Sequence, residues 1–396
     1  MAYGDIGPII DTEIWGGVGV YLPFITHATG DIYLITKGSP FEIYSHTIDD
    51  DGNIGPRIDF LTLGGGANSG SKFIRHIDGD VYAVAYAGAV NNVVETFTCD
   101  AAGNLGAAAI DTEILSLRPG NSSFYPFLLH ATGDIYIVDY TDNADDGWTK
   151  SLRINNDGTI DPFLFAWEHE ASRGHFPWLV HVGGNMYAVV SSSTVNNWGR
   201  LRTFTVSGVG AISGSQEWIF EGADDASNSN CVVEVTTGIF ALFYQGAAGV
   251  GGRIKTVSLD PVTGFIVPLD TWNYDAGVSQ PFATEVSRNA AGTGKIFCVG
   301  NANDSAYQVW TLEILNNGTI ITAMIDTLTL VPADWATSVS LVRFNLVDAI
   351  YFGACYVDLT GGNTSVLKTF EVEGLLGPPV VQRAGLNPAL AEALDI

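Results

Sequence analysis

The amino-acid sequence predicts an all-β fold, a seven-bladed β-propeller of four-stranded antiparallel blades that is closed by the N-terminal strand. Three observations support this fold class. A short motif recurs seven times, each copy contains four strand-like segments, and both chain ends resemble the last strand of a copy. The chain of 396 residues, 46% of them hydrophobic and 46 of them glycines, can bury a large core and make many turns.

The repeated motif reads H-x-x-G-[DN]-[IV]-Y, and its clear copies begin at His27, His76, His130 and His181, with Met186 replacing Ile or Val in the fourth. Three weaker copies follow. The seven units are anchored by aromatic residues 49 to 57 positions apart, which are Tyr33, Tyr82, Tyr136, Tyr187, Phe240, Phe297 and Tyr351. Repeats of this length that each form one small sheet are typical of propellers, because stacking the sheets buries a continuous core.

The third copy shows the four strands of one unit most clearly. Residues 126–130, 134–140 and 150–154 are rich in β-branched and aromatic side chains, and a fourth segment follows the turn at residues 158–160. The turn before the fourth strand carries a glycine in several copies, at Asp51-Gly52, Ala102-Gly103, Asp157-Gly158 and Asn317-Gly318. We expect these glycines to adopt the positive φ that such hairpins need.

Both ends of the chain carry a candidate closing strand. Residues 4–15 and residues 374–381 each match residues 52–61, so eight candidate fourth strands compete for seven blades. We expect the N-terminal segment to close the last blade, because its alternation at residues 10–14 recurs at residues 110–114, whereas Pro379 weakens the other segment.

This closure divides the chain into two parts. The propeller spans residues 1–381, with residues 1–15 as the closing outer strand, and residues 382–396 form a C-terminal tail with a short helix. The tail is expected to dock on its own barrel or on another subunit. In the alternative, the C-terminal segment closes the ring and residues 1–15 add to a neighbour's sheet edge, which builds an assembly.

The repeats resemble β-propeller families in general, and the tandem H-x-x-G-[DN]-[IV]-Y repeats of microbial surface and environmental proteins in particular. The resemblance covers nearly the whole chain. It departs from the WD40 pattern, because no unit ends in Trp-Asp after a Gly-His start, and the paired glycines of kelch units are missing. Propellers include lectins, scaffolds, hydrolases and lyases, so the resemblance implies a fold rather than an activity.

Charge and hydropathy exclude several classes of function. The net charge of −26, from 43 acidic against 17 basic residues, repels phosphate backbones, so we expect no nucleic-acid partner. No run of 18 apolar residues is present, so we expect no membrane insertion, and the first residues lack a signal-peptide pattern. The four cysteines lie far apart without a C-x-x-C pair, which predicts buried thiols rather than a zinc site.

Aligning the seven units places one polar residue of each near the end of the first strand, namely His27, His76, His130, His181, Glu234, Glu285 and Asn345. This ring has two interpretations. It converges on the central channel and holds a metal or an anion, or it is structural. We favour the structural interpretation, because a turn at Thr29-Gly30 pairs His27 with Ile32 and lets each histidine reach an aspartate of the neighbouring blade.

The loops that vary most join the fourth strand to the next blade and the second strand to the third, and these loops emerge on one face. Tryptophan rings stack on sugar faces while charged groups bind hydroxyls, so this loop-rich face is the candidate site for a glycan or a protein. The alternative is that the tryptophans cap the ends of the blades. The candidate ligand-binding residues are Trp148, Trp167, Arg173, His175, Trp198, Trp272 and Trp335.

The insertion before blade 4 holds the densest group of titratable residues. Glu168, Glu170 and His169 provide an alternative in which the protein is a carbohydrate-active hydrolase or lyase. The loop with Asp142, Asp145 and Asp146 is a weak calcium candidate, because it does not follow the EF-hand spacing. We expect no other cofactor.

The sequence therefore predicts a non-catalytic binding or assembly module that recognises a glycan or a protein on its loop-rich face. The resemblance to repeats of microbial surface proteins implies an extracellular, cell-surface or virion-associated component.

Overall fold

The computed structural model describes residues 4–15, 23–38, 41–63, 73–88, 91–117, 126–142, 144–171, 174–193, 198–222, 230–246, 251–274, 280–303, 306–332, 336–345, 350–358 and 364–373. These residues form strands and turns only, and they include no helix long and apolar enough to cross a membrane. The predicted tail at residues 382–396 lies outside the described residues.

Twenty-eight strands form seven separate four-stranded sheets, and every neighbouring pair is antiparallel. Blade 1 consists of β2 (Phe24–Thr29), β3 (Ile32–Lys37), β4 (Glu42–Ile48) and β5 (Ile54–Thr62). Blade 2 consists of β6 (Ile74–Asp78), β7 (Val81–Ala87), β8 (Asn91–Thr98) and β9 (Asp111–Leu117). Blade 3 consists of β10 (Phe127–Thr132), β11 (Ile135–Thr141), β12 (Gly147–Arg153) and β13 (Phe165–Glu170). Blades 4 and 5 consist of β14 (His175–Gly183), β15 (Met186–Ser193), β16 (Trp198–Val206) and β17 (Ile212–Glu221); β18 (Asn230–Thr236), β19 (Ile239–Gln245), β20 (Gly252–Leu259) and β21 (Ile266–Asn273).

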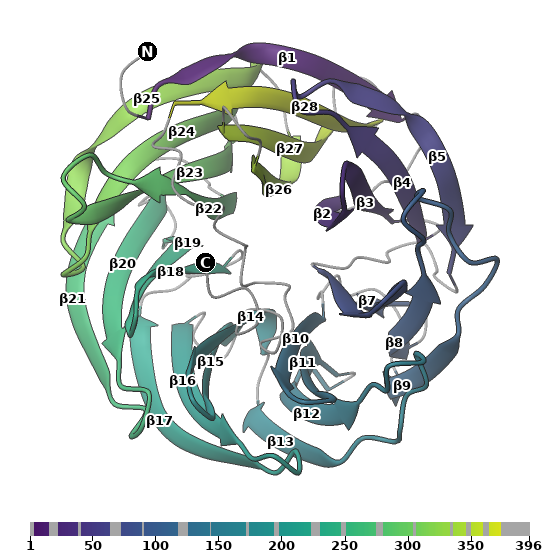
Figure 1. Cartoon of the computed structure of the whole chain (residues 1–396). Coiled ribbons are helices and arrows are strands. Elements are labelled where there is room, and N and C mark those ends of the chain that lie inside the picture. Colours follow the sequence, from purple (N-terminus) through teal and green to yellow (C-terminus); the bar gives the residue numbers. More distant parts are fainter. Residues whose placement is uncertain are drawn as a thin grey trace.

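Blades 6 and 7 complete the circle. They consist of β22 (Gln280–Arg288), β23 (Gly294–Asn303), β24 (Ala306–Leu315) and β25 (Ile320–Pro332); β26 (Ala336–Asn345), β27 (Ile350–Asp358), β28 (Thr364–Val372) and β1 (Ile6–Trp15). Figure 1 shows the sheets arranged around a central axis, with β2, β22 and β26 near the centre and β5, β17 and β21 along the outside. The predicted seven-bladed propeller is confirmed.

The N-terminal strand closes the ring, as predicted. β1 pairs antiparallel with β28, from Ile6 opposite Val372 to Trp15 opposite Ser365. In Figure 1 the purple β1 therefore lies beside the yellow-green β28. Residues 374–381, the competing segment, lie outside the described residues.

Burial decreases from the centre of each blade to its outer edge. The second strands are buried on both faces, so that all seven residues of β11 are buried. The outer strands alternate instead, and β1 exposes Ile10, Thr12 and Ile14 between more buried residues. The core therefore lies between neighbouring sheets, where stacked apolar faces exclude water.

A ring of hydrogen bonds joins the third strand of every blade to the next blade. In each case a Ser or Thr hydroxyl donates to a glycine carbonyl in the turn that leads into the outer strand. The seven bonds are Ser45 to Gly103, Thr96 to Gly158, Ser151 to Gly210, Thr203 to Gly264, Thr256 to Gly318, Thr311 to Gly4 and Thr369 to Gly52, with distances from 2.5 to 2.8 Å. All seven glycines have positive φ, which confirms the predicted role of the turn.

The outer strands form a second set of contacts between blades. An aspartate side chain of one outer strand accepts a hydrogen bond from a backbone N–H of the next blade, at or before the start of its outer strand. Five junctions have this bond, from Ile54 N to Asp11, Leu105 N to Asp59, Ile160 N to Asp111, Ile320 N to Asp270 and Ile6 N to Asp326. Asp11, Asp111 and Asp326 stand in Ile-Asp-Thr triplets, so this pattern links neighbouring blades, and the isoleucine before each aspartate is 37 to 39% exposed.

Candidate functional site at the junction of blades 3 and 4

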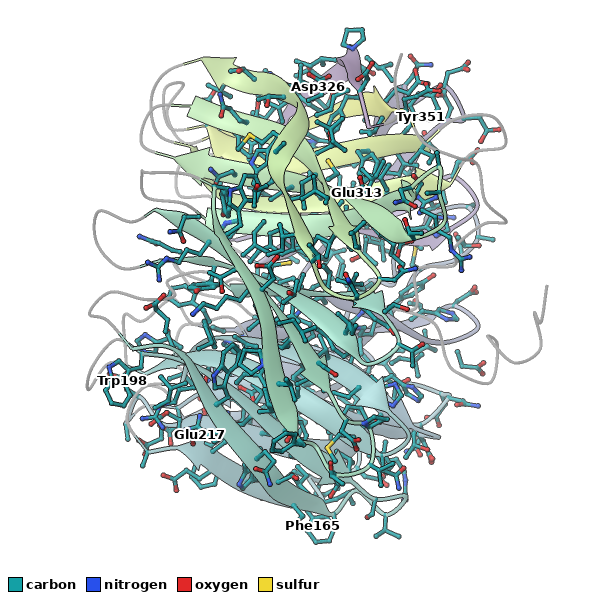
Figure 2. All side chains as sticks on the ribbon, turned by 90° about the vertical axis from the view of Figure 1, so that its left-hand side faces the viewer. Phe165, Trp198, Glu217, Glu313, Asp326 and Tyr351 are labelled. Atoms are coloured by element: carbon teal, nitrogen blue, oxygen red, sulfur yellow. The ribbon has the colours of Figure 1, made fainter. Side chains whose placement is uncertain are left out.

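The junction of blades 3 and 4 brings together most of the site residues predicted from the sequence. Figure 2 shows the propeller from its side, with Trp198 at one margin of the disc, Tyr351 toward the other margin and Phe165 on the outer circumference. Trp198 begins β16, at the margin where second and third strands are connected. Arg173 and Trp335 lie outside the described residues.

The innermost part of the junction is a buried Asp–His pair. The Asp139 carboxylate lies 2.9 Å from His169 Nε2, and both side chains are completely buried. Thr149 donates its hydroxyl proton to the same Asp139 oxygen at 2.5 Å. The second oxygen of Asp139 and Nδ1 of His169 have no hydrogen-bond partner among the described residues.

A β-bulge and two glycines position His169. The pairing of β12 with β13 skips His169, since Gly147 lies opposite Glu170 and Trp148 lies opposite Glu168. The extra residue turns the imidazole inward. A Cβ on Gly147 would lie 2.6 Å from His169 Cε1, and one on Gly174 would lie 2.3 Å from Gly147 Cα. The chain therefore covers the imidazole so closely that no substrate reaches it.

Glu170 takes part in a network of four charged residues that joins the two blades. Its Oε2 lies 3.0 Å from Arg202 Nη2 and 3.3 Å from Arg200 Nε. Both arginines also contact Glu217, at 2.7 Å from Arg200 and 2.9 Å from Arg202. Glu170 of blade 3 thus joins Arg200 and Arg202 of blade 4, whereas the Asp139–His169 contact lies within blade 3. Of the three alternative catalytic residues, only Glu168 is exposed.

The loop above this junction is organised by Asp142. One oxygen of its carboxylate accepts backbone N–H groups of Ala144 at 2.8 Å and Asp146 at 3.0 Å, and the other accepts Nε1 of Trp148 at 3.0 Å. Asp145 adopts a positive φ of 68° and lies 3.6 Å from Nε2 of the buried His175. Asp142 thus shapes the loop and fixes the Trp148 indole.

Asp146 is the titratable group of this loop with a clearly shifted pKa. Burial and the nearby carboxylates of Asp142, Glu168, Asp145 and Glu170 raise its pKa. Among the described residues, no three His, Cys, Asp or Glu side chains are placed to hold one metal ion. A calcium site at Asp142, Asp145 and Asp146 stays a prediction.

The predicted tryptophans divide into two groups. Trp167 packs 5.3 Å from the Phe204 ring and Trp272 packs 6.3 Å from the Trp310 ring, so both lie against the third strand of the next blade. Trp148 and Trp198 are half-buried at the rim, where Arg200 lies 5.7 Å from the Trp198 ring centre. The structure therefore brings Trp148, Trp167, His175 and Trp198 together around blades 3 and 4, while Trp272 belongs to blade 5.

The predicted bond between a histidine and a neighbouring blade's aspartate is wrong. His27 lies opposite Tyr33 and Thr29 lies opposite Ile32, so Ala28 is a bulge and the turn contains Gly30. Nε2 of each histidine bonds the glycine carbonyl of its own turn, from His27 to Gly30, His76 to Gly79, His130 to Gly133 and His181 to Gly184, at 2.7 to 2.8 Å. Each imidazole also packs on the anchor tyrosine of its own blade, 4.9 to 5.1 Å away.

The ring itself also differs from the prediction in blade 7. Phe344 lies opposite Tyr351, whereas Asn345 lies opposite Ile350. The residue equivalent to His27 is therefore the buried Phe344 and not Asn345. Glu234 and Glu285 do lie opposite their anchor residues Phe240 and Phe297, and Lys295 pairs with Glu285 at 2.7 Å.

An aromatic cluster at the centre of the ring was not recognised in the sequence. The first strands of blades 1, 3, 4 and 6 contribute Phe24, Phe127, Trp178 and Phe282, and Phe73 directly precedes the first strand of blade 2. Each of them stands three positions before the residue of the polar ring. This spacing is the signal that could have revealed the cluster, which we call the aromatic plug.

The described geometry defines the chain as a seven-bladed β-propeller. No protein-family model matches its sequence, and no curated protein matches it. A protein from Lactobacillus plantarum has a similar structure, with TM-score 0.52 and 15% identity over 89% of this chain and 94% of that one. A chain of the Saccharomyces cerevisiae complex of Dbp5 with Nup159, Gle1, IP6 and ADP has TM-score 0.52 and 9% identity over 94% and 97%.

A third similar structure is the WD40 domain of SCAP from fission yeast, with TM-score 0.49 and 6% identity over 94% of this chain and 99% of that one. At these identities the likeness concerns the fold alone. The departure of the repeats from the WD40 pattern stays a prediction.

Proposed function

We propose that the protein is a non-catalytic binding module that recognises a glycan at the rim of blades 3 and 4, outside the cell or on a virion. The observation that carries the proposal is the fixed indole of Trp148, whose Nε1 donates to Asp142 at 3.0 Å at the same rim as Trp198. A rigid tryptophan loses little conformational entropy on binding and offers a flat face to a sugar ring.

The charged residues of the junction support binding over catalysis. Glu170 contacts two arginines and His169 contacts Asp139, so these side chains already have partners inside the protein. The exposed Glu168 and the half-buried Asp146 remain at the rim as acceptors for sugar hydroxyls. A general acid and base for glycoside cleavage need two carboxyl groups that both reach the substrate.

A glycan array with the full chain, followed by incubation of each bound glycan, tests this proposal. We expect binding without cleavage, and we expect Trp198→Ala to weaken it at least about tenfold, as the loss of a central aromatic contact does. Phe165→Ala is the matched control, because Phe165 is 43% exposed on the circumference. Equal binding by the Trp198 variant contradicts the proposed rim. Cleavage that Glu168→Gln abolishes favours the hydrolase or lyase alternative.

Assembly is a second candidate role, and the exposed outer strands favour it. Ile14 is 60% exposed, Phe60 51% and Ile114 51%, each on an outer strand whose free edge offers unpaired backbone groups. Such edges pair readily with a further strand. Sedimentation velocity on the chain and on an Ile14→Lys, Ile114→Lys variant tests this role, with association expected only for the unmodified chain.

A further inference from the structure

The central channel is closed by the aromatic plug at one level. Phe24 lies 4.3 Å from Phe73 and 5.7 Å from Phe282, measured between ring centres. Trp178 lies 5.2 Å from Phe73 and 5.4 Å from Phe282. Because blades 1 and 6 and blades 2 and 4 are not neighbours, these side chains meet across the axis of the ring.

The residues two positions further along the first strands form the next layer of the channel. Side chains two apart in a strand share a face, so this layer faces the channel as the plug does. The register supports the assignment, since Arg75 lies opposite Ala83 and Arg343 opposite Phe352, each directly after the anchor tyrosine of its blade. The layer, which we call the channel layer, consists of Thr26, Arg75, Leu129, Val180, Val233, Thr284 and Arg343.

The channel layer has a polar half and an apolar half. Its polar half comes from the consecutive blades 6, 7, 1 and 2, and consists of Thr284, Arg343, Thr26 and Arg75. Its apolar half comes from blades 3, 4 and 5, and consists of Leu129, Val180 and Val233. The apolar residues are only partly buried, which indicates space in front of them.

Arg75 is a buried cation that has no carboxylate partner among the residues that the structure describes. It is 4% exposed, and its Nε donates to the Leu128 carbonyl at 2.8 Å. Its guanidinium carbon lies 4.7 Å from the Phe73 ring centre and 5.7 Å from that of Phe127, directly against the plug. Burial lowers the pKa of Arg75 to about 9, so the group is still charged at neutral pH.

Arg343 of blade 7 is a second buried cation in the channel layer. It is 9% exposed, and its buried Nε has no hydrogen-bond partner among the described residues. The acid that acts on Arg343 is Glu285, which pairs with Lys295 at 2.7 Å. The hydroxyl of Thr26, between the two arginines in blade order, is buried and also lacks a partner in the described part.

Buried cations in proteins are normally paired, because an isolated charge costs several kcal/mol to remove from water. Here two of the 17 basic residues of a chain with net charge −26 lie in the channel, and within the described residues neither forms an ion pair. The missing partner of both arginines is therefore a negatively charged group.

We propose that the channel beneath the plug binds a small organic carboxylate with a compact apolar body. The carboxylate lies between Arg75 and Arg343 and accepts further hydrogen bonds from Thr26 and Thr284. The apolar body lies against Leu129, Val180 and Val233, under the aromatic plug. Arginine suits this task, because its planar fork binds a carboxylate through two N–H groups.

Isothermal titration of the full chain with benzoate tests the proposal. Benzyl alcohol, which has the same ring without the charge, and sulfate, which has charge without the ring, are the comparison ligands. We expect benzoate to bind and the other two to bind at least about tenfold more weakly, since each lacks one half of the match. Equal binding of benzyl alcohol or of sulfate, or no binding of benzoate, overturns the proposal.

Two variants assign the site. Arg75→Met and Arg343→Met each remove one charge and keep most of the volume, and each is expected to raise the benzoate Kd at least about tenfold. Without ligand, their midpoints of urea unfolding should equal or exceed that of the unmodified chain, because an unpaired buried charge has been removed. Arg57→Met, at an exposed arginine of β5, is the matched control.

Two results contradict the assignment to these arginines. One is unchanged benzoate affinity in both folded variants. The other is a urea midpoint below that of the unmodified chain in both variants, together with the raised benzoate Kd. This result would indicate a purely structural role for the guanidinium groups.

Discussion

The hydroxyl of Thr311 donates to the carbonyl of Gly4 at 2.5 Å, across 307 positions of the chain. This bond has the same form as the other six bonds between third strands and turns. It is also the only one of the seven that joins the N-terminal strand to the body of the preceding blade. The side chain of Asp326 reinforces this seam by accepting the N–H of Ile6 at 2.8 Å.

We predict that Thr311→Val loosens the ring at its seam. The variant leaves the buried Gly4 carbonyl without its donor, which costs about 1–3 kcal/mol of unfolding free energy in a urea titration. Thr256→Val is the matched control, since it removes the equivalent bond to Gly318 inside the ring. Both variants should lose similar stability, but only Thr311→Val should speed hydrogen exchange in β1. Equal exchange of β1 in the two variants contradicts this role of the seam.

Removal of residues 1–15 tests which terminus closes the ring. Without β1, the edge of β28 from Ser365 to Val372 is left unpaired, so we expect a lower urea midpoint and association of the shortened chain. A synthetic peptide of residues 4–15 should restore the midpoint, whereas a peptide with the same composition in scrambled order should not. An unchanged midpoint after removal would mean that residues 374–381 can close the blade.

The repeat made the blades predictable, but it did not reveal local register. The sequence His27-Ala-Thr-Gly-Asp31 allows a turn at Thr29-Gly30 or one residue later, and the bulge at Ala28 selects the later one. In blade 7, Phe344 precedes Tyr351 by seven positions, whereas His27 precedes Tyr33 by six. The extra residue moved the expected ring position to Asn345.

The contacts within the candidate site also could not be predicted from the repeat. The sequence indicated a cluster at residues 167–175, but it could not show that the bulge at His169 directs this imidazole to Asp139, 30 positions earlier. This contact depends on the register within the sheet of blade 3, whereas the partners of Glu170 depend on which blades are neighbours. The channel layer was missed for a similar reason, because Arg75 and Arg343 are far apart in sequence and belong to one layer only after the ring closes.

We predict that Asp139 and His169 contribute to the free energy of unfolding only as a pair. His169→Leu leaves a fully buried carboxylate with only the Thr149 hydroxyl as a partner and should cost about 3–5 kcal/mol in urea unfolding. Adding Asp139→Val should recover much of this loss, because an apolar pair needs no compensation. Glu168→Gln, at the exposed neighbour, should change stability by less than about 0.5 kcal/mol. Additive losses in the double variant would contradict direct coupling.

Acid should destabilise the propeller through the aspartates of its turns. Hydrogen bonds from the side chain and backbone of Asn104 lower the pKa of Asp100, and backbone N–H groups of Thr263 and Val262 lower that of Asp260. A carboxyl whose pKa is lower in the folded state than in the unfolded state stabilises the protein at pH values above the unfolded pKa of about 4. This stabilisation disappears as the pH falls through the folded-state pKa. Melting temperatures from pH 7 to pH 2 should therefore fall most steeply below about pH 4, and less steeply for Asp100→Asn with Asp260→Asn.

The aromatic plug should contribute strongly to stability. Trp178 is 6% exposed and contacts plug residues from three other blades, Phe73, Phe127 and Phe282. Trp178→Ala creates a cavity at the centre of the ring and should cost about 3–5 kcal/mol in urea unfolding. Trp198→Ala is the matched control, because it removes the same side chain at the rim and should cost far less. Similar losses in the two variants would show that the centre of the ring is no more tightly packed than its margin, and that the plug does not close the channel.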